Sequence, residues 1–126
     1  NVQSWWDFKH VPNIEFFHYN DFLNDTENEI RRLAVFLEIE VLEEHWPRII
    51  DAISLKSMRA RGEDYVPEGG RAWKGGTDTF LNKGTNGRWR GILSDEQLAQ
   101  YDALCETTLT PDCRAWLEHG RSYDDK

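Results

Sequence analysis

The chain has 126 residues and a net charge of −8 at pH 7, which gives it room for one compact core but not for two ordinary domains. The acidic balance excludes a nucleic-acid-binding protein that relies on bulk electrostatics. No apolar run is long enough to cross a membrane, and the cytoplasm is the expected location. The two cysteines, Cys105 and Cys113, are expected to be free thiols on the apolar faces of helices.

The first stretch, VQSWWDF, is typical of the end of a helix, and Pro12 predicts a turn after it. Residues 14–19 form a short, aromatic-rich apolar run, which predicts one strand that is buried on both faces in a parallel sheet. A single strand needs neighbours for its hydrogen bonds, and this favours a chain that is part of a larger fold.

Three helices are predicted next. Thr26 and Glu29 have the spacing of a capping box. Pro47 fits the first turn of the second helix, which has Trp46 on its apolar face. Ser54 is a candidate cap for a short third helix that ends at Arg61.

The stretch from Gly62 to Lys83 contains several glycines and one proline and shows no helical or strand period. We interpret it as a long loop that could cover a site. Residues 71–91 contain five basic residues and only one acidic residue, Asp78, so a local basic loop lies on an acidic protein. Such a loop suits a small anion better than a polymer, although a solvated loop would look the same.

Two further helices complete the chain. Ser94 and Gln97 predict a capping box for the first of them. Thr110 followed by Pro111 predicts the start of the last helix, because proline suits the first helical position.

The segment FLNKGTNGRWRG, residues 80–91, allows two interpretations. Gly84 and Gly87 fit a plain surface turn, since glycine adopts positive φ without steric cost. Alternatively, the backbone lies close against an anion, with Lys83 as the positive charge and exposed amides as further donors.

The remaining residues give only weak evidence for a metal, catalytic or base-binding site. The four histidines have no partner at zinc-ligand spacing, and His18 is interpreted as a satisfied histidine within the predicted strand. No hydrolase, metalloprotease or Walker motif is present, so we expect no metal site and no catalytic residue in this chain. Tyr19 ends the predicted strand, where it could stack on a base or simply pack in the core.

The succession NVQSWWD, FFHYNDF, NEIRRLAVFL, ISLKSM and NKGTNGRW resembles the carboxyl-terminal half of cytosolic-type sulfotransferases, in the same order and over nearly the whole chain. The resemblance implies an α/β fold class: residues 1–126 would be the carboxyl-terminal, mostly helical part of a single P-loop-like sulfotransferase domain, with residues 14–19 as its one parallel strand. The amino-terminal half of the domain would be absent from this chain.

The resemblance also implies a function, the transfer of a sulfonate from 3′-phosphoadenosine 5′-phosphosulfate to a hydroxyl or amine. Tyr19 would lie near the adenine, Ser54 and Met58 would line its other side, and Asn82, Lys83 and Gly84 would hold the 3′-phosphate, with Trp89 packing at the base of the loop. The sequence departs from the family at several of these positions: Asn82 replaces an arginine, Leu55 an aromatic residue, Ile53 a threonine and Asn20 a glutamate.

The resemblance places the catalytic base and the 5′-phosphosulfate loop in the amino-terminal half, so this chain alone is expected to be inactive. Its expected partners are that half of the fold and a small-molecule acceptor, with no nucleic acid and no membrane, and a homodimer is allowed. The alternative function is a non-catalytic binding or interaction module derived from the same fold, which the substitutions at Asn82 and Leu55 favour.

Overall fold

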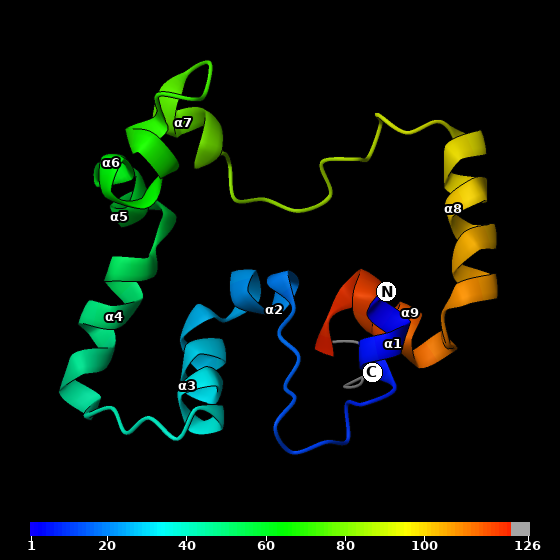
Figure 1. Ribbon diagram of the computed structural model, residues 1–126, viewed down its shortest axis with the longest axis horizontal. Coiled ribbons are helices and arrows are strands. Elements are labelled where there is room, and N and C mark those ends of the chain that lie inside the picture. The colour runs from blue at the N-terminus through cyan, green and yellow to red at the C-terminus, as the bar shows by residue number, and fades with distance from the viewer. Residues whose placement is uncertain (122–126) are drawn as a thin grey trace. The chain divides into compact units, whose positions relative to one another are not determined.

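The computed structural model describes residues 1–121, which form short helices joined by turns and extended segments (Figure 1). The chain divides into two compact units, one made of Asn1–Glu38 with Asn86–Lys126 and the other of Ile39–Thr85. We call them the terminal unit and the central unit and describe each by itself.

The described part of the terminal unit contains five helices. These are α1 (Val2–Trp6), α2 (Tyr19–Asn24), α3 (Thr26–Phe36), α8 (Asp95–Thr108) and α9 (Pro111–His119). Helix α1 lies against α9 (Figure 1), and the rings of Trp6, Phe16 and Trp116 pack together with centroid distances of 5.0 to 5.3 Å. This aromatic cluster joins the beginning of the chain to its last helix.

The central unit is a succession of short helices, each packed against its neighbours along the chain. They are η1 (Glu43–His45), α4 (Trp46–Ile53), α5 (Leu55–Ala60), α6 (Gly62–Tyr65), η2 (Pro67–Gly70) and α7 (Gly76–Phe80). Trp46, Val66 and Leu81 are its buried apolar side chains. The expected loop from Gly62 to Lys83 is therefore wrong in part, because three helical segments interrupt it. Each has four or five residues, too few for a helical period to show in the sequence.

The predicted strand at residues 14–19 does not form, and the described residues contain no strand at all, so the α/β class is not confirmed. Residues 14–18 have no regular structure, and Tyr19 already begins α2. The physical reason is the absence of a neighbouring strand within the described chain. The carbonyl of Phe16 instead accepts a hydrogen bond of 2.7 Å from the Arg32 guanidinium.

Most predicted helix starts are confirmed. Pro47 lies in the first turn of α4, and Pro111 begins α9. Ser94 and Gln97 form both hydrogen bonds of a capping box on α8. The capping box at Thr26 is wrong by one residue: Asp25 is the N-cap of α3, and its carboxylate accepts from the Asn28 amide at 3.1 Å.

Both cysteines are buried and free, as expected. Elsewhere on α8, Tyr101 and Leu104 remain 42% and 61% exposed. No helix in the described part of the chain is long and apolar enough to cross a membrane.

Candidate functional site

Ser54 ends α4 and begins α5 in the central unit. Its backbone is extended, at φ −63° and ψ 143°, and its hydroxyl accepts a hydrogen bond of 3.1 Å from the Ser57 amide, which confirms the predicted cap. Met58 follows one turn later, with its amide bonded to the Ser54 carbonyl at 2.9 Å. Because residues four apart share a helix face, Ser54 and Met58 lie on the same side of α5.

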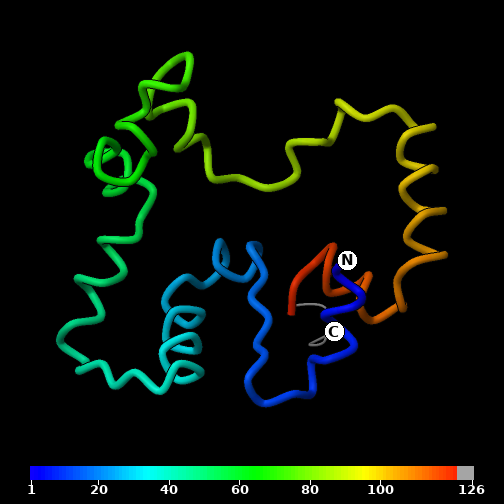
Figure 2. The backbone as a smooth tube through the Cα atoms, viewed as in Figure 1, coloured from blue at the N-terminus to red at the C-terminus, as the bar shows by residue number. Residues whose placement is uncertain are grey.

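The segment Asn82–Gly84 leaves α7 without regular structure, and Figure 2 traces this helix-free path. The Lys83 side chain is exposed, and Gly84 has φ 62°, the positive value predicted for it. The Asn82 side-chain oxygen accepts the Lys83 amide at 2.7 Å. One of the amides expected to face an anion is thus covered by the neighbouring side chain.

Arg59 connects α5 to this loop. Its Nε donates to the Leu81 carbonyl and its Nη2 to the Asn82 carbonyl, both at 2.9 Å. Two parallel donors from one planar guanidinium fix both peptide groups at once. Within the central unit, these two hydrogen bonds therefore link α5 to the loop that carries Lys83.

The role of Arg59 could not be recognised from the sequence. The only signal was a basic residue directly after Met58 on a short helix, and Arg59 lies 22 residues from Leu81 in the sequence. Nothing in the local pattern distinguishes it from the exposed Arg61, whose guanidinium pairs with Asp64 at 3.0 Å.

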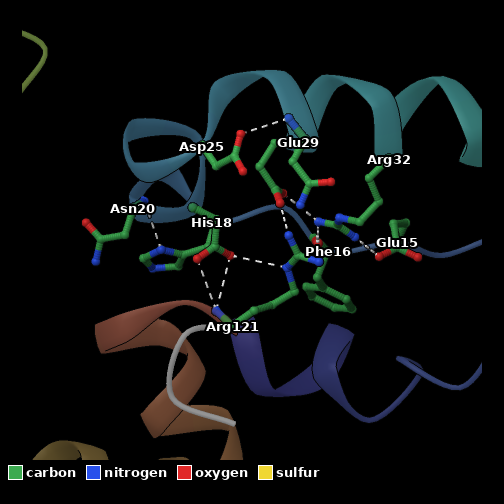
Figure 3. A network of polar contacts seen from close by, with 10 residues as sticks. Glu15, Phe16, His18, Asn20, Asp25, Glu29, Arg32 and Arg121 are labelled. Atoms are coloured by element: carbon green, nitrogen blue, oxygen red, sulfur yellow. Dashed lines mark hydrogen bonds and ion pairs between the residues drawn. The ribbon is translucent and has the colours of Figure 1, made fainter. Parts of the chain in front are cut away.

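Tyr19 belongs to the terminal unit, where it is the first residue of α2 and 49% exposed. His18 is the N-cap of this helix: its Nδ1 accepts from the Asn20 amide at 3.1 Å (Figure 3). The proton of the neutral ring is therefore on Nε2, which donates to the Leu117 carbonyl at 2.9 Å. His18 is a satisfied histidine, as interpreted from the sequence.

A network of charges fixes the segment that carries Tyr19 (Figure 3). Glu29 is 1% exposed and pairs with Arg32 at 2.9 Å and with Arg121. The carboxylate of Asp21, also buried, accepts the Arg121 amide at 3.1 and 3.2 Å. Arg121 thus joins the end of the described chain to α2 and α3, a connection across about a hundred residues that no sequence pattern indicated.

Arg32 extends this network toward residues 15–17. It ion-pairs with Glu15, donates to the Phe16 carbonyl and lies 4.0 Å from the Phe17 ring centroid. An ion pair, a backbone hydrogen bond and a cation–π contact from Arg32 thus fix residues 15–17, although no strand of the described chain pairs with them.

The described residues contain no group of three or more histidine, cysteine or acidic side chains that could hold a metal ion. Burial raises the pKa of the Cys113 thiol, and the negative charges of Asp112 and Asp7 raise it further. A thiol with a raised pKa is mostly protonated at neutral pH, so Cys113 does not have the character of a nucleophile.

Trp89, the last residue implied for the loop, is 49% exposed. The Arg90 guanidinium lies 5.5 Å from its ring centroid. Its packing at the base of the Lys83 loop stays a prediction.

The family model described as "Sulfotransferase domain" matches residues 1–113, which is most of the chain. No solved structure matches the chain.

Several curated sulfotransferases are similar to the chain. It is 28% identical to the "Glycolipid sulfotransferase" of Mycobacterium bovis over 120 residues, which are 94% of this chain and 37% of that protein. It is 31% identical to "Cytosolic sulfotransferase 12" of Arabidopsis thaliana, over 83% of this chain and 32% of the relative. For "Sulfotransferase 1A1" of Rattus norvegicus the identity is 26%, over 90% of this chain and 39% of the relative. The chain spans between about a third and two fifths of the length of these relatives.

Proposed function

Because this chain belongs to the sulfotransferase domain family, we propose that it supplies the 3′-phosphate and adenine side of the donor site for transfer of a sulfonate from 3′-phosphoadenosine 5′-phosphosulfate to a hydroxyl or amine. The observation that carries the proposal is the pair of hydrogen bonds from Arg59 to the carbonyls of Leu81 and Asn82. They join the helix of Ser54 and Met58 to the loop of Lys83, the two pieces that a bound nucleotide would have to touch together.

The chemistry of the loop suits a phosphate. Lys83 offers an exposed positive charge, and Gly84 at φ 62° lets the backbone approach a ligand without a side chain in the way. A phosphate is bound best by a cation together with backbone amides. Lys83 would therefore bind and position the donor and would not transfer a proton.

Residues of two elements would contact the adenine. Ser54 and Met58 share one side of α5, and the thioether of Met58 is suited to contact with an aromatic base. By the resemblance alone, Tyr19, which is half-exposed at the start of α2 in the terminal unit, would lie near the adenine. Asn82 would give a neutral contact where the family has a charged one.

We place no catalytic residue in this chain. In the complete sulfotransferase, a base would deprotonate the acceptor hydroxyl or amine, whose oxygen or nitrogen would form a bond to sulfur as the bond from sulfur to the leaving 5′-phosphate oxygen breaks. Positive groups around the leaving phosphate would stabilise its developing charge. The segment from Gly62 to Lys83 would close over donor and acceptor and exclude water.

An amino-terminal half of the same fold is the proposed partner of this chain. Large apolar side chains remain open to solvent, among them Val35 at 78% and Ile92 at 76% exposure, and they would be covered by that half. A homodimer is a further proposed assembly. The cytoplasm is the proposed location, in line with the name of the Arabidopsis relative, "Cytosolic sulfotransferase 12".

The test is calorimetric binding of adenosine 3′,5′-bisphosphate to the longest natural polypeptide that carries this chain, at two salt concentrations. Lys83→Ala should weaken binding by about 1.5–3 kcal/mol, the size of a charge-assisted hydrogen bond. Lys74→Ala is the matched control, because Lys74 lies in the same basic stretch but outside the proposed loop contact. If both variants bind as tightly as the parent protein, Lys83 does not hold the phosphate.

A non-catalytic interaction module is the second candidate, and one contact favours it. The Lys83 amide donates to the Asn82 side chain at 2.7 Å, so this amide is satisfied without an anion. A well-folded complete protein that binds neither the bisphosphate nor the phosphosulfate would support this second candidate over the first.

A further inference from the structure

Arg59 does more than connect two elements, because it also sets the direction of two backbone amides. Its hydrogen bonds end on the carbonyls of two consecutive residues, Leu81 and Asn82. In a trans peptide the C=O and the following N–H point in opposite directions, and the described chain has no cis peptide bond. The N–H groups of Asn82 and Lys83 are therefore turned away from the guanidinium.

We propose that Arg59 is a positioning residue for 3′-phosphate recognition, which orients the Asn82 and Lys83 amides toward the phosphate by holding the carbonyls of the same two peptide groups. The inference rests on the proposed function, since it assumes that the Lys83 loop is where the phosphate binds. Arg59 itself does not touch the phosphate; it acts through the backbone.

The location of these carbonyls explains why an arginine is needed. Leu81 is the C-cap of α7, and the last carbonyls of a helix have no partner within the helix. A planar guanidinium can satisfy the Leu81 carbonyl and that of the next residue, Asn82, at once, whereas a lysine ammonium is a point donor on a flexible stem. The Leu81 side chain is only 7% exposed, which holds this end of the loop in the unit while Arg59 fixes its peptide planes.

The Asn82 side chain shows that an amide oriented in this way is ready to donate. Its oxygen accepts the Lys83 amide at 2.7 Å, so the amide already donates to an oxygen acceptor on the side away from Arg59. A phosphate oxygen would take the place of this neutral acceptor, and it would gain the attraction of the Lys83 charge as well.

The experiment compares two ligands, adenosine 3′,5′-bisphosphate and adenosine 5′-monophosphate, by calorimetry on the longest natural polypeptide that carries this chain. Arg59→Gln should weaken binding of the bisphosphate about tenfold and leave the monophosphate unchanged. Arg59→Lys should recover only part of the loss, since it cannot hold two carbonyls in one plane. The control is Arg61→Gln, because Arg61 is a neighbouring arginine whose guanidinium pairs with Asp64 instead.

The ratio of the two affinities separates the outcomes. If Arg59→Gln weakens both ligands equally, or neither, the positioning role is overturned. If the parent protein itself shows no preference for the bisphosphate, the proposed function fails and the inference fails with it. If Lys83→Ala removes the preference and Arg59→Gln does not, only the inference about Arg59 is wrong.

Discussion

Buried ion pairs hold the segment that carries Tyr19, whereas hydrogen bonds from exposed side chains hold the loop that carries Lys83. Around Tyr19, the buried carboxylates of Asp21 and Glu29 are paired with arginines that come from α3 and from the end of the described chain. Around Lys83, the loop is exposed, and the side chains of Arg59 and Asn82 hold its backbone.

The difference has a physical meaning for the proposed site. A charge that is buried needs its partners in place, so the Tyr19 segment is expected to be rigid before any ligand binds. In the loop, the Lys83 side chain is exposed to water, and the Lys83 amide donates to the Asn82 side chain, which a ligand could displace. Ligand binding can therefore change these contacts at a small cost in free energy. Stability should depend on the first region and ligand affinity on the second.

The largest effect is expected from Glu29→Ala. It removes the carboxylate that pairs with Arg32 and Arg121, so each guanidinium group loses one of its partners and the network loses its most deeply buried charge. We expect the free energy of unfolding to fall by about 3 kcal/mol, the lower end of the range for breaking a buried pair, because both arginines are partly exposed. Urea denaturation followed by tryptophan fluorescence measures the change.

Glu27→Ala is the control for this variant. Glu27 lies on the same helix and pairs with Arg31 at 2.8 Å, but the pair is exposed and should contribute less than about 1 kcal/mol. Equal midpoints for the two variants would show that the buried network does not stabilise the terminal unit.

The second effect concerns Gly120, where the chain turns back onto Asp21. Its φ is 78° and its ψ −164°, and an added Cβ would meet the Asp21 carboxylate oxygen at 2.4 Å. Gly120→Ala should destabilise the protein by about 2 to 3 kcal/mol, from backbone strain together with displacement of the carboxylate. Gly91→Ala separates these causes, because Gly91 has φ 76° and open space around it, and should cost only about 1 kcal/mol. A similar loss of stability in both variants, measured by urea denaturation, would mean that the contact with Asp21 adds nothing.

The sequence predicted those features whose cause lies within a few residues. Ser54, Ser94 with Gln97, and Pro111 are local signals, since a cap acts within one turn of its helix. The error at Thr26 has the same origin. Asp25 and Thr26 are both good N-cap residues, and the sequence pattern does not show which of the two caps α3.

The rest depends on contacts between distant residues. Arg121 pairs with Asp21 across a hundred positions, and Arg59 reaches Leu81 across 22. An apolar run such as residues 14–19 favours a buried strand, but whether one forms depends on a neighbour that the run cannot specify, and here the segment is only partly buried. For the candidate site, the resemblance supplied the loop residues and left out the arginine that orients them.

A smaller loss of stability is expected from removing the N-cap of α8, because this cap acts only within its own helix. Ser94→Ala removes the side chain that accepts the Gln97 amide at 3.2 Å and should destabilise α8 by about 1 kcal/mol. Hydrogen exchange of the α8 amides measures the change. Faster exchange in the first turn of α8, without a change in the amides of α3, is the expected pattern, and an unchanged α8 would contradict it.

The smallest effect is a dependence on pH where α1 meets α9. Asp112 accepts hydrogen bonds from Lys9 at 2.6 Å and from Trp6 at 2.8 Å, and these contacts, with that of Lys9 the largest, hold the pKa of its carboxyl well below the usual range. The unfolded chain has the ordinary value of about 3.9. The charged carboxylate therefore stabilises the fold above that pH, and this contribution is lost as the pH falls toward the lower pKa of the folded state.

Comparison with Asp112→Asn isolates this contribution from the other acidic groups. The difference in free energy of unfolding between parent and variant should be constant from about pH 7 to about pH 5 and should shrink below about pH 4. A difference that stays constant into strong acid, or that is already lost at about pH 5, would contradict the assigned pKa direction. Because Asp112 is exposed whereas Glu29 is buried, the difference should also decrease with added salt, and the contribution of Glu29 should change less.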